Sequence, residues 1–364
     1  MRIVVAMSGG VDSSVAAALL KAQGHDVVGV SMQLYDQREG AEAFGTCCTI
    51  DDLHDARRVA AAIGIPHYIL NLERQFEETV VRNFVGEYAA GRTPLPCAHC
   101  NSDLKFSTLL DRAVGFNASV VATGHYARVE QQPDGRWILR RGTDLSKDQS
   151  YFLFSLTQPQ LAQAMFPVGA LQKSEVRATA QTLGLTVADK PDSQEICFVP
   201  SGDYAAFVAR RAPGVVEAGP IVDAEGHQLG SHGGIHRFTV GQRKGLGLSA
   251  SAPLYVLRLE PASGTVVVGE RAALDRGTLT AAGVNWVSMP APEAWTPVTA
   301  QIRHHHTAAS GRLRALDGNR AELVFDEPQS AITPGQAAVF YDGDVVVGGG
   351  WIESDPAGAG ARSH

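Results

Sequence analysis

The sequence predicts an α/β protein with a doubly wound parallel sheet at its N-terminal end, a small central domain and a C-terminal β-barrel. Short apolar runs alternate with stretches of helical period until about residue 128, which is the pattern of a parallel sheet covered by helices. Between residues 214 and 269 glycines are frequent and the apolar runs become short. From residue 278 to 352 nearly every stretch resembles a short strand bounded by turn residues, which favours a small barrel.

Strands and helices alternate through the predicted N-terminal domain. Apolar runs predict strands over residues 2–7, 27–33, 67–72 and 119–123. Apolar side chains at helical spacing predict helices over residues 11–21, 51–63, 73–90, 104–114 and 173–183. In the long helix at 73–90, Phe76, Val80, Phe84 and Tyr88 share one face and are expected in the core. Asp134-Gly135 predicts the turn of a hairpin.

Changes in composition predict where the domains begin and end. We expect a nucleotide-binding catalytic domain over residues 1–202, a small central domain over 203–274 and a barrel over 275–354. The last residues, 355–364, consist mainly of Gly, Ala, Ser and Pro, so we expect a disordered tail.

Bulk properties exclude several classes of protein. The net charge of −7 argues against a surface coated with nucleic acid, although a local basic cleft is compatible with it. Residues 151–172 carry no charge but include glutamines and prolines, so they do not predict a membrane span. No signal segment precedes the first strand, and the five cysteines are an odd number. These two features predict a cytoplasmic protein in a reducing compartment, with no membrane partner.

The N-terminal stretch RIVVAMSGGVDSS, residues 2–14, predicts a phosphate-binding turn between a strand and a helix. Glycines in such a turn let the backbone approach a ligand, and its N–H groups and the helix dipole favour phosphate. Ser8, Ser13 and Ser14 add hydroxyl donors, and Asp12 is a candidate Mg²⁺ ligand. Because ligands of parallel sheets lie beyond the carboxyl ends of the strands, Met32 and Gly124 should face the same site.

Two common nucleotide loops do not fit this stretch. A Walker A loop requires Gly-Lys-Ser/Thr, and the dinucleotide fingerprint requires G-x-G-x-x-G, whereas this loop reads SGGVDSS. It resembles instead the SGGxDS loop of the ATP pyrophosphatases (the PP-loop group), which cleave ATP to AMP and pyrophosphate. The plainer alternative is a structural glycine turn capped by serine.

Three interpretations of the cysteines remain open at this point. Cys97 and Cys100 form a C-x-x-C in an expected loop just before a helix, whose positive end favours the thiolate form. Cys197 stands alone, and Cys47-Cys48 is an adjacent pair. The thiols are small buried hydrophobes, or Cys97 and Cys100 are half of a zinc or iron–sulfur site completed by Cys47 or Cys48, or two distant thiols handle sulfur over the nucleotide. The metal or iron–sulfur site is not the favoured interpretation.

Seven ordered blocks resemble one family, the tRNA-specific 2-thiouridylases, over about residues 1 to 352. The blocks are AMSGGVDSSVAA, CNSDLKF, ATGHYAR, KDQSYFLFSL, KPDSQEICFV, FTVGQRKGLGL and PGQAAVFYDGDVVVGGG. The resemblance implies an adenine nucleotide α-hydrolase-like N-terminal domain. It implies ATP-dependent 2-thiolation of the wobble uridine of tRNA, with adenylation of the C2 oxygen, transfer of persulfide sulfur, and release of AMP and pyrophosphate. ATP, Mg²⁺, tRNA and a persulfide-donating sulfur carrier protein are the expected cofactors and partners.

The resemblance also implies roles for individual residues. Cys100 and Cys197 would be catalytic, as nucleophile and persulfide carrier, and attack by the second thiol would leave a disulfide between them or release sulfide first. ATP would be bound by Ala6, Met7, Ser8, Gly9, Gly10, Val11, Asp12, Ser13, Met32 and Gly124. The tRNA would be contacted by Leu95, Pro96, Cys97, His125, Lys147, Asp148, Gln149, Arg303, His304 and Gln336.

Two departures from the family pattern bear on these roles. Many members have Asn-Pro-Asp where this chain has Leu95-Pro96-Cys97, so a thiol replaces a carboxylate beside the target base. Arg303 is followed by three histidines, for which we expect a solvated or tRNA-facing strand rather than a metal site. Two other functions are kept as alternatives. One is an ammonia-using synthetase or amidotransferase on the same loop, which would need no thiol pair. The other is a nucleotide-binding regulator without turnover.

Overall fold

The computed structural model describes residues 1–35, 50–192, 196–199, 202–215 and 217–354. Cys47, Cys48 and the tail predicted to be disordered lie outside these ranges. The chain divides into two compact units. The N-terminal unit comprises residues 1–81, 96–202 and 344–346, and the C-terminal unit comprises 82–95, 203–343 and the residues after 346. Among the described residues, no helix combines the length and the apolar character needed to cross a membrane.

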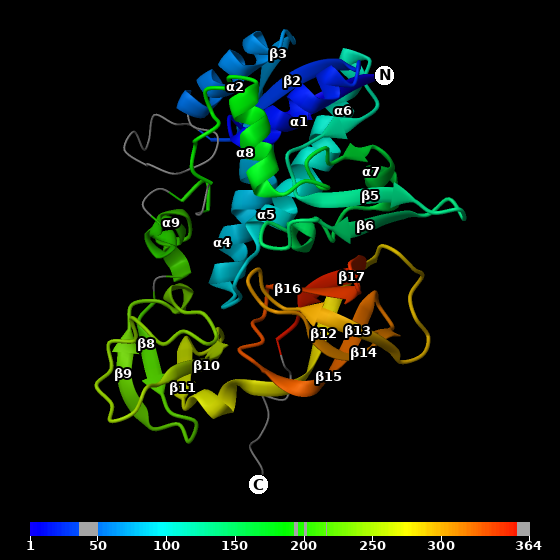
Figure 1. The fold of residues 1–364 in the computed structure, drawn as a ribbon. Coiled ribbons are helices and arrows are strands. Elements are labelled where there is room, and N and C mark those ends of the chain that lie inside the picture. The colour runs from blue at the N-terminus through cyan, green and yellow to red at the C-terminus, as the bar shows by residue number, and fades with distance from the viewer. Residues whose placement is uncertain (36–49, 193–195, 200–201, 216, 355–364) are drawn as a thin grey trace. The chain divides into compact units, whose positions relative to one another are not determined.

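A five-stranded sheet forms the centre of the N-terminal unit (Figure 1). Its order is β3-β2-β1-β4-β7, and all four pairings are parallel. The strands are β1 (Arg2–Ala6), β2 (Asp26–Gln33), β3 (His67–Asn71), β4 (Val121–Ala122) and β7 (Ala164–Met165). Four of them were expected from apolar runs, and the two-residue β7 was not, because so short a strand has no periodicity to detect.

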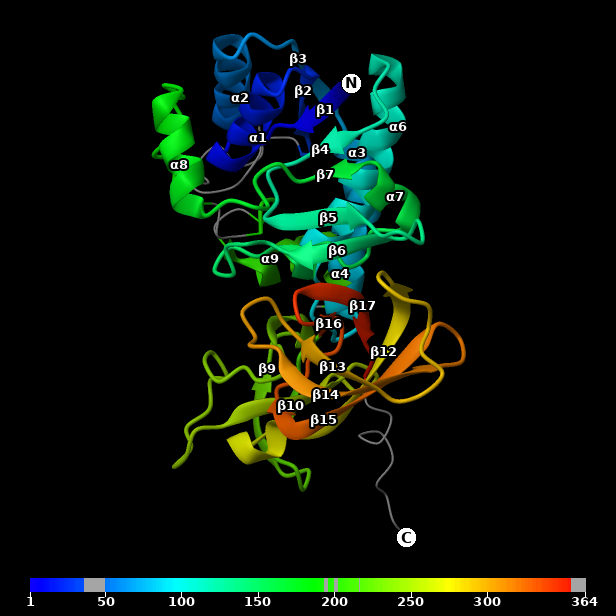
Figure 2. The ribbon, with the colours of Figure 1, turned by 45° about the vertical axis from the view of Figure 1, so that its right-hand side comes forward.

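Helices cover both faces of this sheet, as the doubly wound prediction requires (Figure 2). On one side lie α1 (Val11–Ala22), α2 (Ile50–Ala62) and α8 (Lys173–Thr182). Their apolar faces pack on the sheet around Val5, Val15 and Val176, none of which is exposed. On the other side lie α3 (Glu73–Phe76) and α6 (Leu109–Ala113), with α7 (Gln158–Ala162) nearby. Strands β1, β2 and β4 are therefore buried on both faces and read as continuous apolar runs, whereas the edge strand β3 leaves Tyr68 and Ile69 exposed.

Two long helical stretches differ from the prediction in detail. The stretch at 73–90 is helical, but a π-helical turn at Glu77–Val81 separates α3 from α4 (Arg82–Ala89), and the chain passes there from the N-terminal to the C-terminal unit. The second stretch begins at Pro96 rather than Leu104, as α5 (Pro96–His99), a π-helical segment (Cys100–Thr108) and α6. The loop expected around Cys97 and Cys100 was therefore wrong. Proline at the first helical position starts the helix instead.

The hairpin predicted from Asp134-Gly135 is confirmed. It joins β5 (Ala127–Gln131) and β6 (Trp137–Arg141), which pair in antiparallel register. Gly135 has a φ of +88°, a left-handed conformation that glycine adopts without strain.

The C-terminal unit contains a helical pair and a small sheet. α4 packs on α9 (Tyr204–Arg211) through aromatic rings, and the centroids of Phe84 and Phe207 lie 6.0 Å apart. The small sheet has the order β10-β11-β8-β9. Its strands are β8 (Gly219–Val222), β9 (Gln228–His232), β10 (Tyr255–Glu260) and β11 (Thr265–Gly269). This sheet lies within the range predicted for the central domain, residues 203–274.

The remaining strands form a closed six-stranded antiparallel barrel, which confirms the prediction for the C-terminal end. Its order is β12-β15-β14-β13-β16-β17, and β12 also pairs with β17 to close it. The strands are β12 (Asp275–Trp286), β13 (Thr296–Gln301), β14 (Ala309–Leu316), β15 (Arg320–Ser330), β16 (Ala337–Asp342) and β17 (Val345–Ile352). Alternate residues such as Leu313, Leu323 and Phe340 point inward and are fully buried.

Candidate active site

The phosphate loop, defined here as Met7–Ser14, joins the end of β1 to the start of α1. Gly9 has a φ of +77°, and a Cβ atom there would lie 2.2 Å from the backbone oxygen of Asp52 in α2. Glycine is required at this position by conformation and by space. Gly10 is the N-cap residue of α1 and offers no side chain to cap it. The first-turn N–H groups are therefore open to an anionic ligand.

The loop's serines differ in what they can contact. The hydroxyl of Ser14 is buried and donates to the backbone oxygen of Gly10 at 2.8 Å. The hydroxyl of Ser13 accepts from the backbone N–H of Ser8 at 3.2 Å. Ser8 itself is exposed at the turn. Ser13 and Ser14 therefore shape the loop, and Ser8 is the hydroxyl best placed to meet a ligand.

The ends of neighbouring strands lie against the loop. A Cβ atom at Gly124, just past β4, would come within 2.5 Å of the backbone nitrogen of Ser13. In β2, the Ser31 hydroxyl donates to the backbone oxygen of Met7 at 2.7 Å, and the next residue, Met32, is 6% exposed. Parallel strands thus bring Gly124 and Met32 to the edge of the sheet that carries the phosphate loop.

Asp12, the candidate Mg²⁺ ligand, is held by two residues that sequence reasoning did not identify. The Lys173 ammonium lies 2.7 and 2.8 Å from the two carboxylate oxygens of Asp12. The Tyr126 hydroxyl donates to Asp12 at 2.8 Å, and burial together with the charge of Asp12 raises the tyrosine pKa. Tyr126 lies inside the ATGHYAR block. Lys173 has only a weak signal, as the first charge after the uncharged stretch 151–172. A Mg²⁺ ion on Asp12 would have to share this carboxylate with Lys173.

Three cations meet at Asp192. Lys173 lies 2.9 Å from one of its carboxylate oxygens, Lys147 lies 2.9 Å from the other, and Arg177 lies 3.2 Å from the first. Burial opposes ionisation of Asp192, but the hydrogen bonds from Lys173 and Lys147 outweigh it and lower its pKa to about 2. Asp192 is therefore charged at neutral pH, and Lys173 joins it directly to Asp12.

Lys190, two residues before Asp192 in the sequence, makes a second connection to the phosphate loop. Its ammonium lies 3.1 Å from the backbone oxygen of Gly9 and pairs with Asp52 and Asp55 of α2. Burial disfavours the charged ammonium, but the hydrogen bonds that it donates to both carboxylates reverse this, so the pKa of Lys190 is raised. Residues 190–192 are thus fixed to both sides of the loop.

Cys100 is the first residue of the π-helical segment and is 9% exposed, whereas Cys97, one turn earlier, is exposed. The next residue, Asn101, is 2% exposed and donates from its side chain to the backbone oxygen of Phe152 at 3.0 Å. Its carbonyl oxygen accepts from Lys105 at 3.0 Å. π-Helical turns are uncommon and often occur at functional sites. The CNSDLKF block therefore fixes the backbone around Cys100.

His125 lies near Lys105 and is neutral. Burial lowers its pKa well below the ordinary value, and the charge of Lys105 adds to the effect. The Nδ1 atom of His125 lies 2.7 Å from the Thr123 hydroxyl, and its ring packs on the edge of Phe166. A neutral imidazole can stack on or hydrogen-bond a base, but it brings no charge to a phosphate.

The side chains of Asp148 and Gln149 are engaged within the N-terminal unit. Asp148 is largely buried and accepts hydrogen bonds from Arg141, the Gly142 backbone and Ser150. The side-chain oxygen of Gln149 accepts from the Tyr126 backbone at 3.0 Å. Both residues therefore hold the KDQ stretch beside Tyr126, so a contact with tRNA would be an additional role.

Cys197 follows Asp192 by five positions and is partly exposed. Its neighbour Phe198 packs edge-on against Phe76 of α3, with ring centroids 5.3 Å apart. α3 also packs against the π-helical segment that begins with Cys100. Both candidate catalytic cysteines thus belong to the same unit, and their neighbours share contacts with α3.

The remaining tRNA candidates include residues of the C-terminal unit. Arg303 and His304 are exposed in a turn after β13, which corrects the expected strand. The side-chain nitrogen of Gln336 donates to the backbone oxygens of Thr93 and Pro94, each at 3.1 Å. Leu95 follows Pro94 and is buried, as is Pro96.

Potential metal ligands cluster elsewhere in the described part of the chain. Asp223, Glu225 and His227 have ligand atoms within 4.8 Å of one another, and no group of three there includes Cys97, Cys100 or Cys197. The cluster is explained by its turn, because Asp223 accepts from the backbones of Glu225 and His227. It therefore indicates a β8–β9 turn rather than a metal site.

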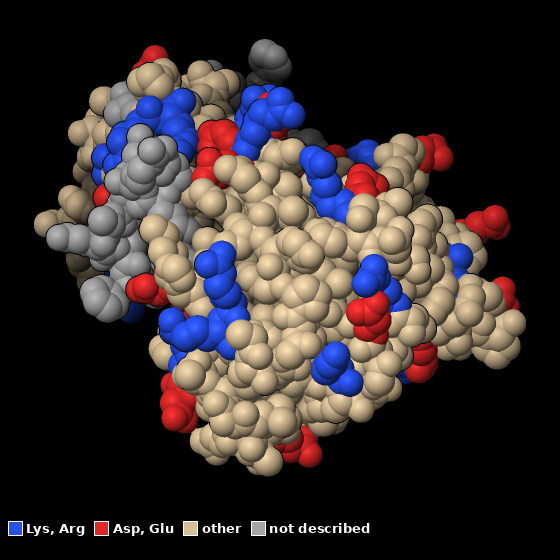
Figure 3. Space-filling view, turned by 90° about the horizontal axis from the view of Figure 1, so that it is seen from above, with Lys and Arg blue, Asp and Glu red and all other residues tan. Residues whose placement is uncertain are grey.

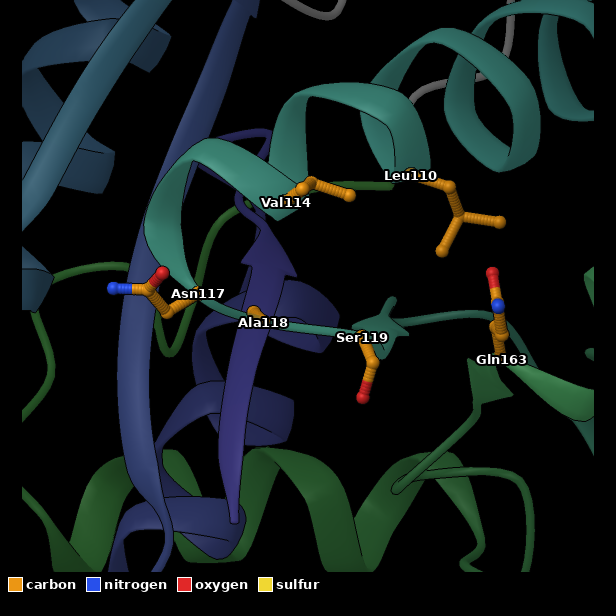
Figure 4. Close-up of a pocket in the computed structure, with 6 residues that line it drawn as sticks. All are labelled: Leu110, Val114, Asn117, Ala118, Ser119 and Gln163. Carbon is orange, nitrogen blue, oxygen red and sulfur yellow. The ribbon is translucent and has the colours of Figure 1, made fainter.

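Neither the pocket nor the charged surface shown in the figures marks a second site. The pocket in Figure 4 is lined by Leu110, Val114, Asn117, Ala118, Ser119 and Gln163. It lies at the start of β4, whereas the phosphate loop lies at the opposite, carboxyl end of the strands. On the face in Figure 3, Lys and Arg side chains are scattered among uncharged ones rather than gathered in one patch.

Comparison with known proteins identifies the family. Residues 1–201 match the model of the tRNA methyl transferase HUP domain, 205–270 that of the tRNA methyl transferase PRC-barrel domain and 276–352 that of the aminomethyltransferase beta-barrel domain. A tRNA-specific 2-thiouridylase MnmA from Geotalea uraniireducens is 52% identical over 100% of this chain and 98% of its own length. Another from Solibacter usitatus is 55% identical over 96% of this chain and 99% of its own. This chain belongs to the tRNA-specific 2-thiouridylase (MnmA) family.

MnmA relatives are similar across the whole chain, so membership covers both units. A third relative, from Geobacter metallireducens, is 50% identical over 97% of each chain. Among solved structures, a 4-thiouridine synthetase in complex with RNA and ATP matches 58% of this chain at 14% identity with a TM-score of 0.36. That likeness is too weak to support any residue assignment.

Proposed function

We propose that the protein is an ATP-dependent tRNA-uridine 2-sulfurtransferase that converts the wobble uridine of tRNA to 2-thiouridine. One observation carries the proposal. Ion pairs of Lys173 and Lys190 tie the phosphate loop to the segment that leads to Cys197. A nucleotide-binding turn tied to residues 190–192, five positions after which Cys197 follows in the sequence, suits a reaction in which ATP activates a substrate and sulfur then attacks it. MnmA relatives about half identical over the full chain support the same function.

The first step would activate the uridine. The C2 oxygen of uridine is a poor leaving group, and its attack on the α-phosphorus of ATP makes AMP the leaving group and releases pyrophosphate. The open N–H groups at the start of α1 would hold the phosphates, with Ser8 and Lys173 at the loop. Asp12 would hold a Mg²⁺ ion, which neutralises phosphate charge when bound.

The second step would transfer sulfur. Cys197 would carry a persulfide, and its terminal sulfur would attack C2 and expel AMP, which leaves that sulfur bonded to both C2 and Cys197. The Cys100 thiolate would then attack the Cys197 sulfur. The S–S electron pair would return to the sulfur on C2, forming the 2-thio group and a Cys100–Cys197 disulfide. A cellular thiol reductant would reset the pair, and a sulfur carrier protein would supply the persulfide.

Roles for the remaining candidates follow from their environments. Neutral His125 and the exposed Cys97 suit contact with the flipped-out base, and Arg303 suits contact with phosphate. Pro96, His304 and Gln336 remain tRNA candidates with Lys147, Asp148 and Gln149. We propose the domain boundaries 1–202, 203–274 and 275–354 and a cytoplasmic location.

The test is incubation of the purified protein with ATP, Mg²⁺, a persulfide source and unmodified tRNA, followed by nucleoside analysis. We expect 2-thiouridine and equimolar AMP and pyrophosphate. Cys197→Ser should still bind ATP and tRNA and accumulate adenylated tRNA, because the base is activated but receives no sulfur. Cys100→Ser should accept a persulfide on Cys197 but fail to complete the cycle.

Other results would support the alternatives. Full activity of both Cys→Ser variants with ammonia as nucleophile would indicate an amidotransferase-like synthetase. ATP binding without pyrophosphate release would indicate a regulator, and a methylated base would indicate methyl transfer. Activity and metal content of the Cys97→Ser variant decide the role of Cys97. If Cys97 only replaces a carboxylate beside the target base, the variant keeps much of the activity. If Cys97 is a metal ligand, the variant loses both its activity and about one bound metal ion per chain.

A further inference from the structure

Cys97 and Cys100 lie one helical turn apart and differ in exposure. Cys97 is the second residue of α5, and Cys100 follows α5 directly as the first residue of the π-helical segment. Both are thiols in the structure, and Cys97 is exposed whereas Cys100 is 9% exposed. Residues three apart in a helix lie on the same side of it, with Cα atoms roughly 5 Å apart. A disulfide needs Cα atoms about 4.4 to 6.8 Å apart, so this spacing permits one.

The backbone that carries the two thiols is held in place. The Ser102 hydroxyl donates to the backbone oxygen of Ala98 at 3.1 Å, across the junction between α5 and the π-helical segment. The Nδ1 atom of His99 lies 3.1 Å from the Asp103 carboxylate across the same junction. The two thiols therefore stay one turn apart. Their Cβ atoms, roughly 5 to 6 Å apart in a helix, must approach by about 1 Å to form a disulfide, so such a bond would be labile.

We propose that Cys97 is the resolving thiol for Cys100: it attacks a disulfide formed on the Cys100 sulfur and converts it to a Cys97–Cys100 disulfide. The Cys97 thiolate bonds to the Cys100 sulfur, and the S–S electron pair leaves with the former partner of Cys100, which takes up a proton. This exchange consumes no oxidant or reductant. A cellular dithiol then reduces the Cys97–Cys100 disulfide by supplying two electrons and two protons, and itself becomes a disulfide.

The difference in exposure gives the second thiol its use. Because Cys100 is nearly buried, a dissolved reductant reaches a disulfide on it slowly. Cys97 is attached one turn away, so it reacts as if it were present at a concentration far above that of a dissolved thiol. After the exchange, the oxidised bond ends at the exposed Cys97 sulfur, where a reductant can attack it.

In the proposed reaction, the partner that leaves Cys100 would be Cys197. Attack by Cys97 on the Cys100–Cys197 disulfide would release Cys197, which could accept the next persulfide while the reductant acts on the other two cysteines. This use of Cys97 rests on the proposed function, whereas the exchange between Cys97 and Cys100 does not.

The test follows the tryptic peptide of residues 93–105, in which Cys97 and Cys100 are the only cysteines. The full-length Cys197→Ser protein is purified without oxygen, treated with the aromatic disulfide of thionitrobenzoate, quenched with N-ethylmaleimide, digested and analysed by mass spectrometry. We expect an adduct on Cys100 to be displaced, so that the peptide carries a disulfide and no adduct. When Cys97→Ser is added, the adduct on Cys100 should persist at least about tenfold longer.

A displaced thiol is the matched control. Cys97→Ser combined with His99→Cys keeps two thiols, but neighbouring residues point about 100° apart around a helix and do not face each other. The Cys100 adduct should persist there as it does in Cys97→Ser alone. The proposal is overturned if the adduct lasts equally long with Cys97 present, or if the displaced thiol removes it as fast. It is also overturned if the purified chain holds about one metal ion that both Cys97→Ser and Cys100→Ser lose, since the two thiols are then metal ligands.

A second measurement separates this proposal from the proposed function. In thiolation of tRNA at limiting dithiothreitol, the ratio of the steady-state rate to the first-turnover rate should fall at least about tenfold in Cys97→Ser, and excess dithiothreitol should restore it. The ratio removes any effect of the substitution on contact with the base. An unchanged ratio would overturn the resolving role of Cys97 in the cycle. Thiolation by Cys197→Ser would instead refute the proposed function and leave the exchange measured in that variant unaffected.

Discussion

The ammonium group of Lys190 lies 3.1 Å from the backbone oxygen of Gly9, at the point where the phosphate loop turns through a left-handed conformation. The same ammonium pairs with Asp52 and Asp55, so one side chain joins the loop to α2. We expect Lys190→Gln to lower the free energy of unfolding by about 2 kcal/mol and to raise the KM for ATP in pyrophosphate exchange. Denaturant titration and the exchange assay measure the two effects.

Arg58→Gln is the control for Lys190. Arg58 pairs with the same Asp55 but its side chain is 60% exposed, so its loss should change stability by less than about 0.5 kcal/mol. Equal effects of the two variants would mean that the contact of Lys190 with Gly9 contributes nothing to the loop.

Substitution of Gly124 tests whether the end of β4 forms one side of the nucleotide site. A Cβ atom there would lie 2.5 Å from the Ser13 backbone nitrogen, which cannot move without displacing the start of α1. Gly124→Ala should therefore weaken ATP binding by about tenfold or more, as measured by calorimetry. In Gly115→Ala, where nothing lies within 4 Å of the new atom, affinity should be unchanged. Normal affinity in Gly124→Ala would place the nucleotide away from this edge.

The Asp192 ion pairs predict a specific loss of stability in acid. Its pKa is about 2 in the folded protein against an ordinary 3.8, so the ionised form stabilises the fold above pH 3.8. This stabilisation, at most about 2 kcal/mol, is lost as the pH falls from about 4 to 2. Asp192→Asn should flatten the dependence of unfolding free energy on pH in that window. An unchanged slope would show that Asp192 is not the titrating group.

Substitution of Gln336 distinguishes a structural role of this residue from a contact with tRNA. Its side chain donates to the carbonyls of Thr93 and Pro94, so Gln336→Ala should cost about 1 to 2 kcal/mol of stability. The exposed Gln228 makes one hydrogen bond, to Gly230, and Gln228→Ala should cost less than about 0.5 kcal/mol. If Gln336→Ala instead weakens tRNA binding at unchanged stability, the resemblance assigned the residue correctly.

Salt dependence distinguishes two basic residues expected at tRNA. Arg303 is exposed, and its removal should lower the slope of log affinity against log salt by about one unit. The charge of Lys147 is already compensated by Asp192 at 2.9 Å, so Lys147→Gln should lower the slope by clearly less. Filter-binding titrations at several salt concentrations measure both slopes. A larger effect at Lys147 would mean that tRNA breaks its ion pair.

Local patterns predicted the fold well, whereas contacts distant in sequence could not be predicted. The apolar runs of β1 to β4 and the turn at Asp134-Gly135 are local signals, and each appears in the structure. The helix around Cys100 was missed because its apolar period is interrupted by a π-helical segment. Lys173 and Lys190 escaped notice because nothing in their neighbourhoods shows that each reaches the phosphate loop. Their partners lie 161 and 181 positions earlier in the chain.

Residues 82–95 are flanked on both sides by the N-terminal unit, yet they belong to the C-terminal unit. Their partners are made much later, since Thr93 and Gln336 are 243 positions apart. At ordinary rates of translation the ribosome needs roughly 10 to 50 seconds to cover that interval. Phe207, whose ring packs against Phe84 of α4, is also made later than α4. The nascent chain therefore carries residues 82–95 before their partners exist, and neither unit can be cut from the gene as one uninterrupted fragment.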